Sequence, residues 1–152
     1  MLLRENDIQS VADVRSLPGS RRYPWFDKET MMLALPKEGI AYRHFPGLGG
    51  RRKVNPNSHN TAWRNVAFRG YADYMETPEF NQALEELKAV ALKERTAYMC
   101  SEAVWWKCHR SMISDRLKTD GWKVIHIMGP NKTEEHPYTQ PAKVVQGKLF
   151  YD

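Results

Sequence analysis

The sequence contains few cysteines and no long apolar run, and both absences narrow the class of protein. Two cysteines in 152 residues are too few for a disulfide framework, so we expect reduced thiols in a cytoplasmic protein. A bridge between Cys100 and Cys108 is the less favoured alternative. No apolar run approaches the ~18 residues of a membrane span, and the first residues lack the pattern of a signal peptide. We therefore expect a soluble protein that does not bind membranes.

Internal repeats, low-complexity blocks and linkers are also absent, so the sequence predicts a single domain over residues 1–152. A chain of this length buries roughly 68–70% of its unfolded surface, which suffices for a hydrophobic core without stabilising disulfides or metals. The apolar share of 41% and the charged share of 27% are ordinary for a globular protein.

Basic charge is concentrated in one stretch of the chain. The net charge is +5, yet residues 15–71 contain eleven basic and three acidic residues, so the remainder is net acidic. Arginine guanidinium groups bind phosphate through paired hydrogen bonds, and aromatic side chains stack on bases. This stretch therefore suggests a nucleotide, nucleic acid or phosphorylated metabolite as partner. A solvated basic face is the alternative interpretation. The arginines assigned to binding are Arg21, Arg22, Arg51, Arg52, Arg64 and Arg69.

Short apolar runs alternate with helical patterns and predict an α/β fold. This alternation is typical of a three-layer sandwich with a mainly parallel sheet and Rossmann-like crossovers. A long loop at 46–65 is expected to be functional. Residues 143–150 suggest a C-terminal hairpin on a Gln-Gly turn, which could be an edge ribbon or the contact of a homodimer. The expected strands are 10–14, 40–45, 95–100 and 122–128, and the expected helices begin near 27, 78 and 108.

Ligands of such sheets bind beyond the carboxyl ends of the strands. Arg15, His44, Cys100 and His126 stand at or near those ends, so we expect them at one edge of the sheet. His126 alternates with two isoleucines, which fits a site residue and a satisfied core histidine equally well. Asp13, inside an apolar strand, is expected to be a buried acid paired with an arginine or a helix terminus.

The segment from Cys100 to Arg110 contains most of the candidate catalytic side chains. A strand delivers Cys100, a seven-residue loop follows, and Cys108, His109 and Arg110 open a helix. Free N–H groups at a helix start bind anions and favour thiolate, so either cysteine could be a nucleophile with His109 as base. Phosphatase and rhodanese loops have a similar architecture, although nine residues separate Cys100 from Arg110 here instead of five.

Each of these assignments has an alternative. Cys100 fits a buried core position as well as a catalytic one. Glu102 could be a general base or the partner of an arginine. A metal at Cys100, Cys108 and His109 is conceivable, but no Cys-x-x-Cys or His-x-x-x-His pair supports it, and we expect neither a metal nor a cofactor.

Several motifs resemble a family of bacterial and archaeal proteins called domain of unknown function 488. They are Asp-Val-Arg-Ser-Leu-Pro-Gly-Ser-Arg-Arg at 13–22, Leu-Gly-Gly-Arg-Arg at 48–52, Phe-Arg-Gly-Tyr-Ala-Asp-Tyr-Met at 68–75, Thr-Pro-Glu-Phe at 77–80, Met-Cys-Ser-Glu at 99–102, Cys-His-Arg-Ser-Met-Ile at 108–113 and the closing Val-Ile-His-Ile. The resemblance implies a three-layer α/β domain and no established reaction. It also implies that the family's N-terminal strand, with its Gly-His-Ser turn, is missing from this chain. The residues to which it assigns functional weight are Arg15, Ser20, Arg21, Gly49, Arg51, Tyr71, Cys100, Glu102, Cys108, His109 and Arg110.

Three functions are compatible with the sequence. The first is a hydrolase or transferase acting on a phosphate-bearing substrate through a cysteine thiolate or the Glu102–His109 pair. The second is a non-catalytic protein that binds nucleotides or nucleic acid through its arginines. A structural role, with the loop at 46–65 as an interface, is the third and weakest.

Overall fold

The computed structural model of the chain describes residues 2–16, 26–102 and 104–152. Two compact units are evident: unit 1 comprises Met1–Gly49 and Glu79–Ser101, and unit 2 comprises Gly50–Pro78 and Glu102–Asp152. Within the described residues, no helix combines the length and apolar character that crossing a membrane requires.

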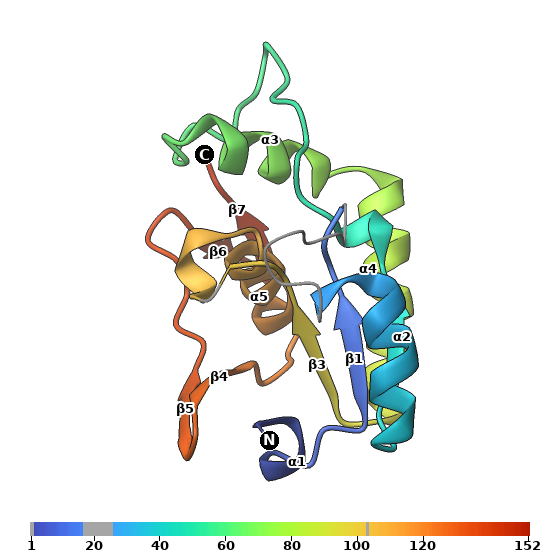
Figure 1. Cartoon of the computed structure of the whole chain (residues 1–152). Helices are drawn as coiled ribbons and strands as arrows, with labels where there is room; N and C mark the ends of the chain where they lie inside the picture. Colours follow the sequence, from blue (N-terminus) through green and yellow to red (C-terminus); the bar gives the residue numbers. More distant parts are fainter. Residues whose placement is uncertain (1, 17–25, 103) are drawn as a thin grey trace. The chain divides into compact units, whose positions relative to one another are not determined.

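Unit 1 confirms the predicted α/β fold. Three strands form a parallel sheet in the order β2-β1-β3, and the chain passes through a helix between successive strands. In the central strand, Val11 pairs with Tyr42 on one side and Ala97 on the other. Figure 1 shows helices α2 and α4 running along this sheet. The elements are α1 (Leu2–Glu5), β1 (Ser10–Asp13), α2 (Lys28–Lys37), β2 (Ala41–His44), the 3-10 helix η2 (Pro46–Leu48), α4 (Pro78–Lys93) and β3 (Thr96–Met99).

Apolar side chains at strand and helix spacing build the core of this unit. Val11 of β1 packs with Met31 of α2 and with Ile40, which precedes β2. α4 begins at Pro78, as its sequence predicts, because proline has no N–H to leave unpaired in a first turn. Its buried residues Phe80, Ala83, Leu84 and Leu87 share one helical face.

A buried ion pair closes the end of the central strand. Nε and Nη2 of Arg15 donate to the two carboxylate oxygens of Asp13 at 2.8 and 2.6 Å. The hydroxyl of Tyr42 donates to the same carboxylate, and burial together with that contact raises the pKa of Tyr42. The expected pairing of Asp13 with an arginine is therefore confirmed.

Unit 2 combines helices with two antiparallel hairpins. The predicted helix at residue 108 appears as α5, and its Ile113 and Met112 are fully buried. The helix α3 was not among the predicted helices, and Asn65 caps it by accepting hydrogen bonds from the N–H groups of Ala67 and Phe68. The elements are α3 (Val66–Tyr74), the 3-10 helix η3 (Trp105–Lys107), α5 (Arg110–Thr119), β4 (Ile125–Gly129), β5 (Lys132–Glu135), β6 (Lys143–Val145) and β7 (Lys148–Phe150).

The prediction of a fourth parallel strand at 122–128 is wrong. Residues 125–129 do form a strand, but β4 pairs antiparallel with β5. The turn between them passes through Pro130 and through Asn131 at φ 54°, a conformation that asparagine tolerates better than most residues. Because β5 consists of exposed polar residues, it carries no apolar pattern that a sequence reading could detect.

The predicted C-terminal hairpin is confirmed. β6 and β7 pair antiparallel, and the two residues between them, Gln146 and Gly147, have φ values of 50° and 76°. Two successive positive φ values are the requirement of a type I′ turn, whose twist matches that of the flanking strands.

The ion pair of unit 1 yields a stability prediction. Arg15→Met should lower the free energy of unfolding by about 3–5 kcal/mol, because Asp13 would remain buried without its counter-charge. Urea denaturation followed by circular dichroism measures this change. The control Glu85→Gln removes only an ion pair of an exposed glutamate with Lys88 and should cost less than ~1 kcal/mol. Equal stability of Arg15→Met and the unmodified protein would contradict the assignment.

Candidate functional site

The thiol of Cys108 receives two hydrogen bonds from one residue. The backbone N–H of Arg110 lies 3.3 Å from Sγ, and its side-chain Nε–H lies 3.2 Å from the same atom. N–H donors of this kind, one of them cationic, stabilise negative charge on sulfur. The arrangement exists because Cys108 ends the short helix η3 and Arg110 begins α5. Cys108 is buried, so solvent would contribute little to stabilising such a charge.

The guanidinium of Arg110 is also fixed by the loop that precedes it. Its Nη2 donates to the carbonyl oxygen of Glu102 at 2.6 Å. Glu102 thus contributes a backbone acceptor to the site, and its residue is exposed. Its predicted role as a general base is a separate matter and stays a prediction.

His109 lies against two further parts of unit 2. Its ring centroid is 5.0 Å from that of Tyr71 on α3. A Cβ at Gly50 would stand 3.1 Å from Nδ1 of His109, so the close approach of this loop favours a residue without a side chain. Tyr71 is almost fully buried, and burial raises its pKa well above the ordinary value. The phenol is therefore neutral and can donate a hydrogen bond.

The arginine-rich loop follows Gly50 and is held on α3. A Cβ at Gly70 would stand 2.2 Å from the carbonyl oxygen of Arg52, so the loop backbone passes directly over that glycine. The guanidinium carbon of Arg52 lies 3.7 Å from the ring centroid of Tyr74, a cation–π geometry. Between Gly50 and Tyr71 the sequence has five basic residues and no acidic one.

Unit 2 therefore brings together a large part of the predicted site. Tyr71 meets His109, while Glu102 and Cys108 meet Arg110. Gly50, which also meets His109, was not among the predicted site residues. Arg69 donates from Nε to the carbonyl of Trp63 at 3.0 Å. Arg51 and Arg64 are exposed residues of the same unit.

Other predicted site residues belong to unit 1 or fall outside the described residues. Arg15 is buried and pairs with Asp13, and Nε2 of His44 lies 2.6 Å from the carbonyl oxygen of Arg15. Cys100 is half-buried just beyond β3. Gly49 lies so close to Ser16 that a Cβ would meet its Oγ at 2.3 Å. Ser20, Arg21 and Arg22 lie outside the described residues. A cavity shared by Cys100 and Cys108 would join the two units, and it stays a prediction.

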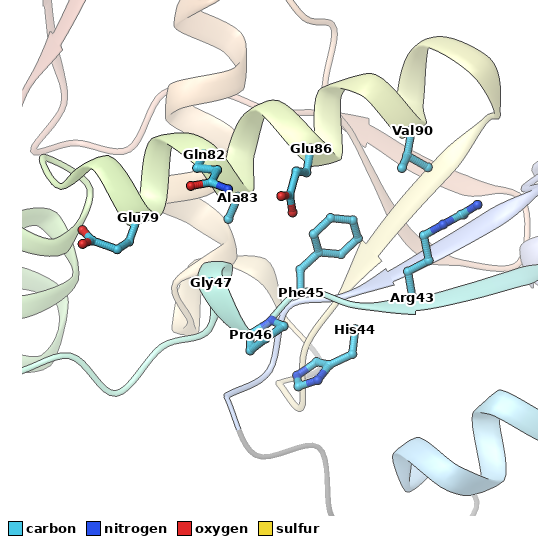
Figure 2. A pocket seen from close by; sticks show the side chains of 10 residues that line it. All are labelled: Arg43, His44, Phe45, Pro46, Gly47, Glu79, Gln82, Ala83, Glu86 and Val90. Atoms are coloured by element: carbon cyan, nitrogen blue, oxygen red, sulfur yellow. The ribbon is translucent and has the colours of Figure 1, made fainter.

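Unit 1 contains an open hollow of about 580 Å³. Figure 2 shows it between the end of β2, from which Phe45 points toward α4, and the side chains of Gln82 and Glu86 on that helix. Two carboxylates in the lining disfavour an anionic ligand, so we do not place the phosphate site there. The lining residues are Arg43, His44, Phe45, Pro46, Gly47, Glu79, Gln82, Ala83, Glu86 and Val90.

The sequence did not indicate a buried polar network that connects α5 to the C-terminal segment. Its members are Asp115, His126, His136, Thr139 and Tyr151. Asp115 stands among the buried residues of α5, and a buried acid in a helix is the one signal that could have revealed it. Among the residues that the structure describes, no group of three or more histidine, cysteine or acidic side chains is arranged to hold a metal ion.

The contacts of Arg110 yield a test on the thiol itself. In Arg110→Met the Nε–H donor is lost, so the pH at which iodoacetamide alkylates half of Cys108 should rise by about one unit or more. Peptide mass spectrometry measures the alkylated fraction. Arg116→Met is the matched control, because Arg116 lies on the same helix and pairs with Asp120. An unchanged pH profile in Arg110→Met would show that the donor does not stabilise the thiolate.

Comparison with known proteins supports the motif-based resemblance. Residues 1–117 match the family described as Domain of unknown function DUF488. No curated protein and no solved structure matches the chain. The matched region contains the whole Cys108–Arg110 turn and more than half of the chain, and the chain is therefore a member of the DUF488 family.

Proposed function

We propose that this protein is a hydrolase or transferase that acts on a phosphate-bearing substrate, with the thiolate of Cys108 as its nucleophile. The observation that carries the proposal is the pair of N–H donors from Arg110 on the sulfur. Nucleophilic cysteines are activated by such electropositive surroundings, whereas structural cysteines in apolar cores are not.

In the proposed reaction Sγ attacks the phosphorus atom of a phosphate ester. A sulfur–phosphorus bond forms, the bond from phosphorus to the leaving oxygen breaks, and that oxygen leaves with the bonding electron pair. Arg110 and the first N–H groups of α5 bind the phosphoryl oxygens, since a helix N-terminus and an arginine fork both favour a dianion. His109 gives the leaving oxygen its proton. Water, or an acceptor alcohol in a transferase, then attacks phosphorus and returns the sulfur as thiolate.

The charge of unit 2 supports a phosphate-bearing substrate. Arg51, Arg52 and Arg64 belong to the stretch that has only basic charged residues, and the aromatic face of Tyr74 already holds one guanidinium. Such a surface attracts anions from solution, and its affinity for them falls as the salt concentration rises. The same surface supports the second function, a protein that binds nucleotides or nucleic acid without turnover.

The proposal predicts a covalent intermediate. With p-nitrophenyl phosphate as a monoester probe and bis(p-nitrophenyl) phosphate as a diester probe, the protein should release p-nitrophenol from at least one. Cys108→Ser should reduce that rate by about 10³-fold or more, since the nucleophile is lost. Acid-quenched mass spectrometry should find the phosphoryl group on the peptide that contains Cys108.

The turnover of Cys100→Ser is measured in parallel, because the sequence analysis proposed either cysteine as the nucleophile. A loss confined to Cys108→Ser assigns the chemistry to unit 2. Full turnover by a folded Cys108→Ser variant would end the proposal. Salt-sensitive binding of an oligonucleotide without any turnover would support the non-catalytic function instead. The logarithm of the association constant would then fall by about 0.7–0.9 per contacted phosphate for each unit of the logarithm of salt concentration.

A further inference from the structure

The carboxylate of Asp115 is buried in unit 2 and accepts four hydrogen bonds. They come from Nε2 of His136 at 2.8 Å, from N and Oγ1 of Thr139 at 3.0 and 2.5 Å, and from the hydroxyl of Tyr151 at 2.7 Å. Donors on both oxygens favour the ionised carboxylate. Burial and the nearby Asp115 raise the pKa of Tyr151, so its phenol keeps its proton. Asp115 is therefore an acceptor only.

This carboxylate fixes the protons of two histidines in sequence. Because Asp115 accepts, Nε2 of His136 must carry a proton, which leaves Nδ1 of a neutral His136 as an acceptor. That Nδ1 lies 2.8 Å from Nε2 of His126, so Nε2 of His126 is the donor to a neutral His136. Nδ1 of a neutral His126 then presents an unprotonated lone pair. Among the described residues, nothing donates a hydrogen bond to it.

The ring of His126 is held close to the Cys108 turn. Trp105 stacks on it with a centroid distance of 4.6 Å and an interplanar angle of 5°, and Trp105 stands three residues before Cys108 in η3. Burial, His136 and the charge of Arg110 together lower the pKa of His126 to about 4. The imidazole is therefore neutral at physiological pH and lies within electrostatic range of the guanidinium that binds Cys108.

We propose that Asp115, His136 and His126 form a proton relay for the Cys108 site, in which Nδ1 of His126 removes the proton from the attacking water. This inference rests on the proposed function, and it names His126, rather than the His109 that the first step leaves unprotonated, as the base of the second step. His126 is the catalytic residue of the relay. His136 and Asp115 are positioning residues, since they act only through His126.

The second histidine removes an unfavourable charge interaction that a single histidine would leave in place. A proton arriving on Nδ1 of His126 would create a cation near Arg110, which is unfavourable. As Nδ1 gains that proton, the proton on Nε2 can pass to Nδ1 of His136. The positive charge then resides on His136, whose Nε2 lies 2.8 Å from the Asp115 carboxylate. One proton leaves water and one charge appears beside the carboxylate, while the hydroxide so formed attacks phosphorus and the sulfur–phosphorus bond breaks.

A network that only satisfied the buried carboxylate of Asp115 would not need His126. Asp115 is satisfied by His136, Thr139 and Tyr151, and none of these four bonds involves His126. His126 extends the chain by one further ring and ends it in an acceptor nitrogen. The groups that face His126 are His136 following β5, Arg110 on α5 and the indole of Trp105 on η3.

The first test needs no variant and no substrate. Histidine nitrogen-15 NMR on the intact protein at pH 7 should show His126 as a neutral ring that carries its proton on Nε2. His126 should remain neutral down to about pH 4. A proton on Nδ1 of His126 at pH 7, or a charged His126 ring, overturns the relay whatever the enzyme assay shows.

The second test separates the two chemical steps with the ester probe of the higher rate. His126→Gln should keep the rapid first release of p-nitrophenol, because thiolate attack does not use His126, and should lower the steady-state rate by about 10²–10⁴-fold, because water loses its base. His126→Ala should regain part of this rate when imidazole is added. His59→Gln is the control, because His59 is an exposed histidine of the same unit that pairs with Glu76.

The outcomes distinguish this inference from the proposed function. A normal first release with an unchanged steady-state rate in His126→Gln overturns the relay alone. Absence of any first release in the unmodified protein overturns the proposed function, and the role of the relay with it. Loss of the steady-state rate in His126→Gln, with imidazole rescue of His126→Ala, supports both, since a merely structural histidine would not respond to free imidazole.

Discussion

The buried charge of Asp115 is the constraint on which unit 2 depends. An ionised carboxylate removed from water is tolerated only when donors surround it, and its donors come from residues 136–151. The carboxylate thereby fixes the C-terminal segment on the middle of α5. Tyr151 is held a second time, since its carbonyl accepts from the N–H of Ala62. The C-terminal segment is thus held on α5 by hydrogen bonds to one buried carboxylate.

Helix α5 supports both polar centres of this unit. Its first residue, Arg110, turns two donors onto the sulfur of Cys108, and Asp115 lies later on the same helix. A rigid helix keeps the thiol and the carboxylate at a constant separation, which is what a two-step reaction with different groups in each step requires. The buried apolar residues Met112 and Ile113 lie between them and hold the helix in place.

Residue patterns predicted the elements that bury apolar side chains. The runs at 10–14, 40–45 and 95–100 became the parallel sheet, and the buried acid Asp13 revealed its arginine partner because an unpaired charge there would be costly. β4 was assigned the wrong pairing because an apolar alternation shows that a strand is half-buried and says nothing about its neighbour. The bond from His136 to Asp115 spans 21 residues, and such a contact has no period along the chain. The turn at Cys108–Arg110 was found because all its groups lie within three residues.

The stacking of Trp105 on His126 has an optical consequence. An indole in van der Waals contact with an imidazole loses fluorescence when that imidazole becomes charged, because the cation accepts an electron from the excited ring. The emission of Trp105, isolated as the difference from a Trp105→Phe protein, therefore reports the charge of the His126 ring in solution. An acid titration of this emission would therefore follow the protonation of His126 without a label.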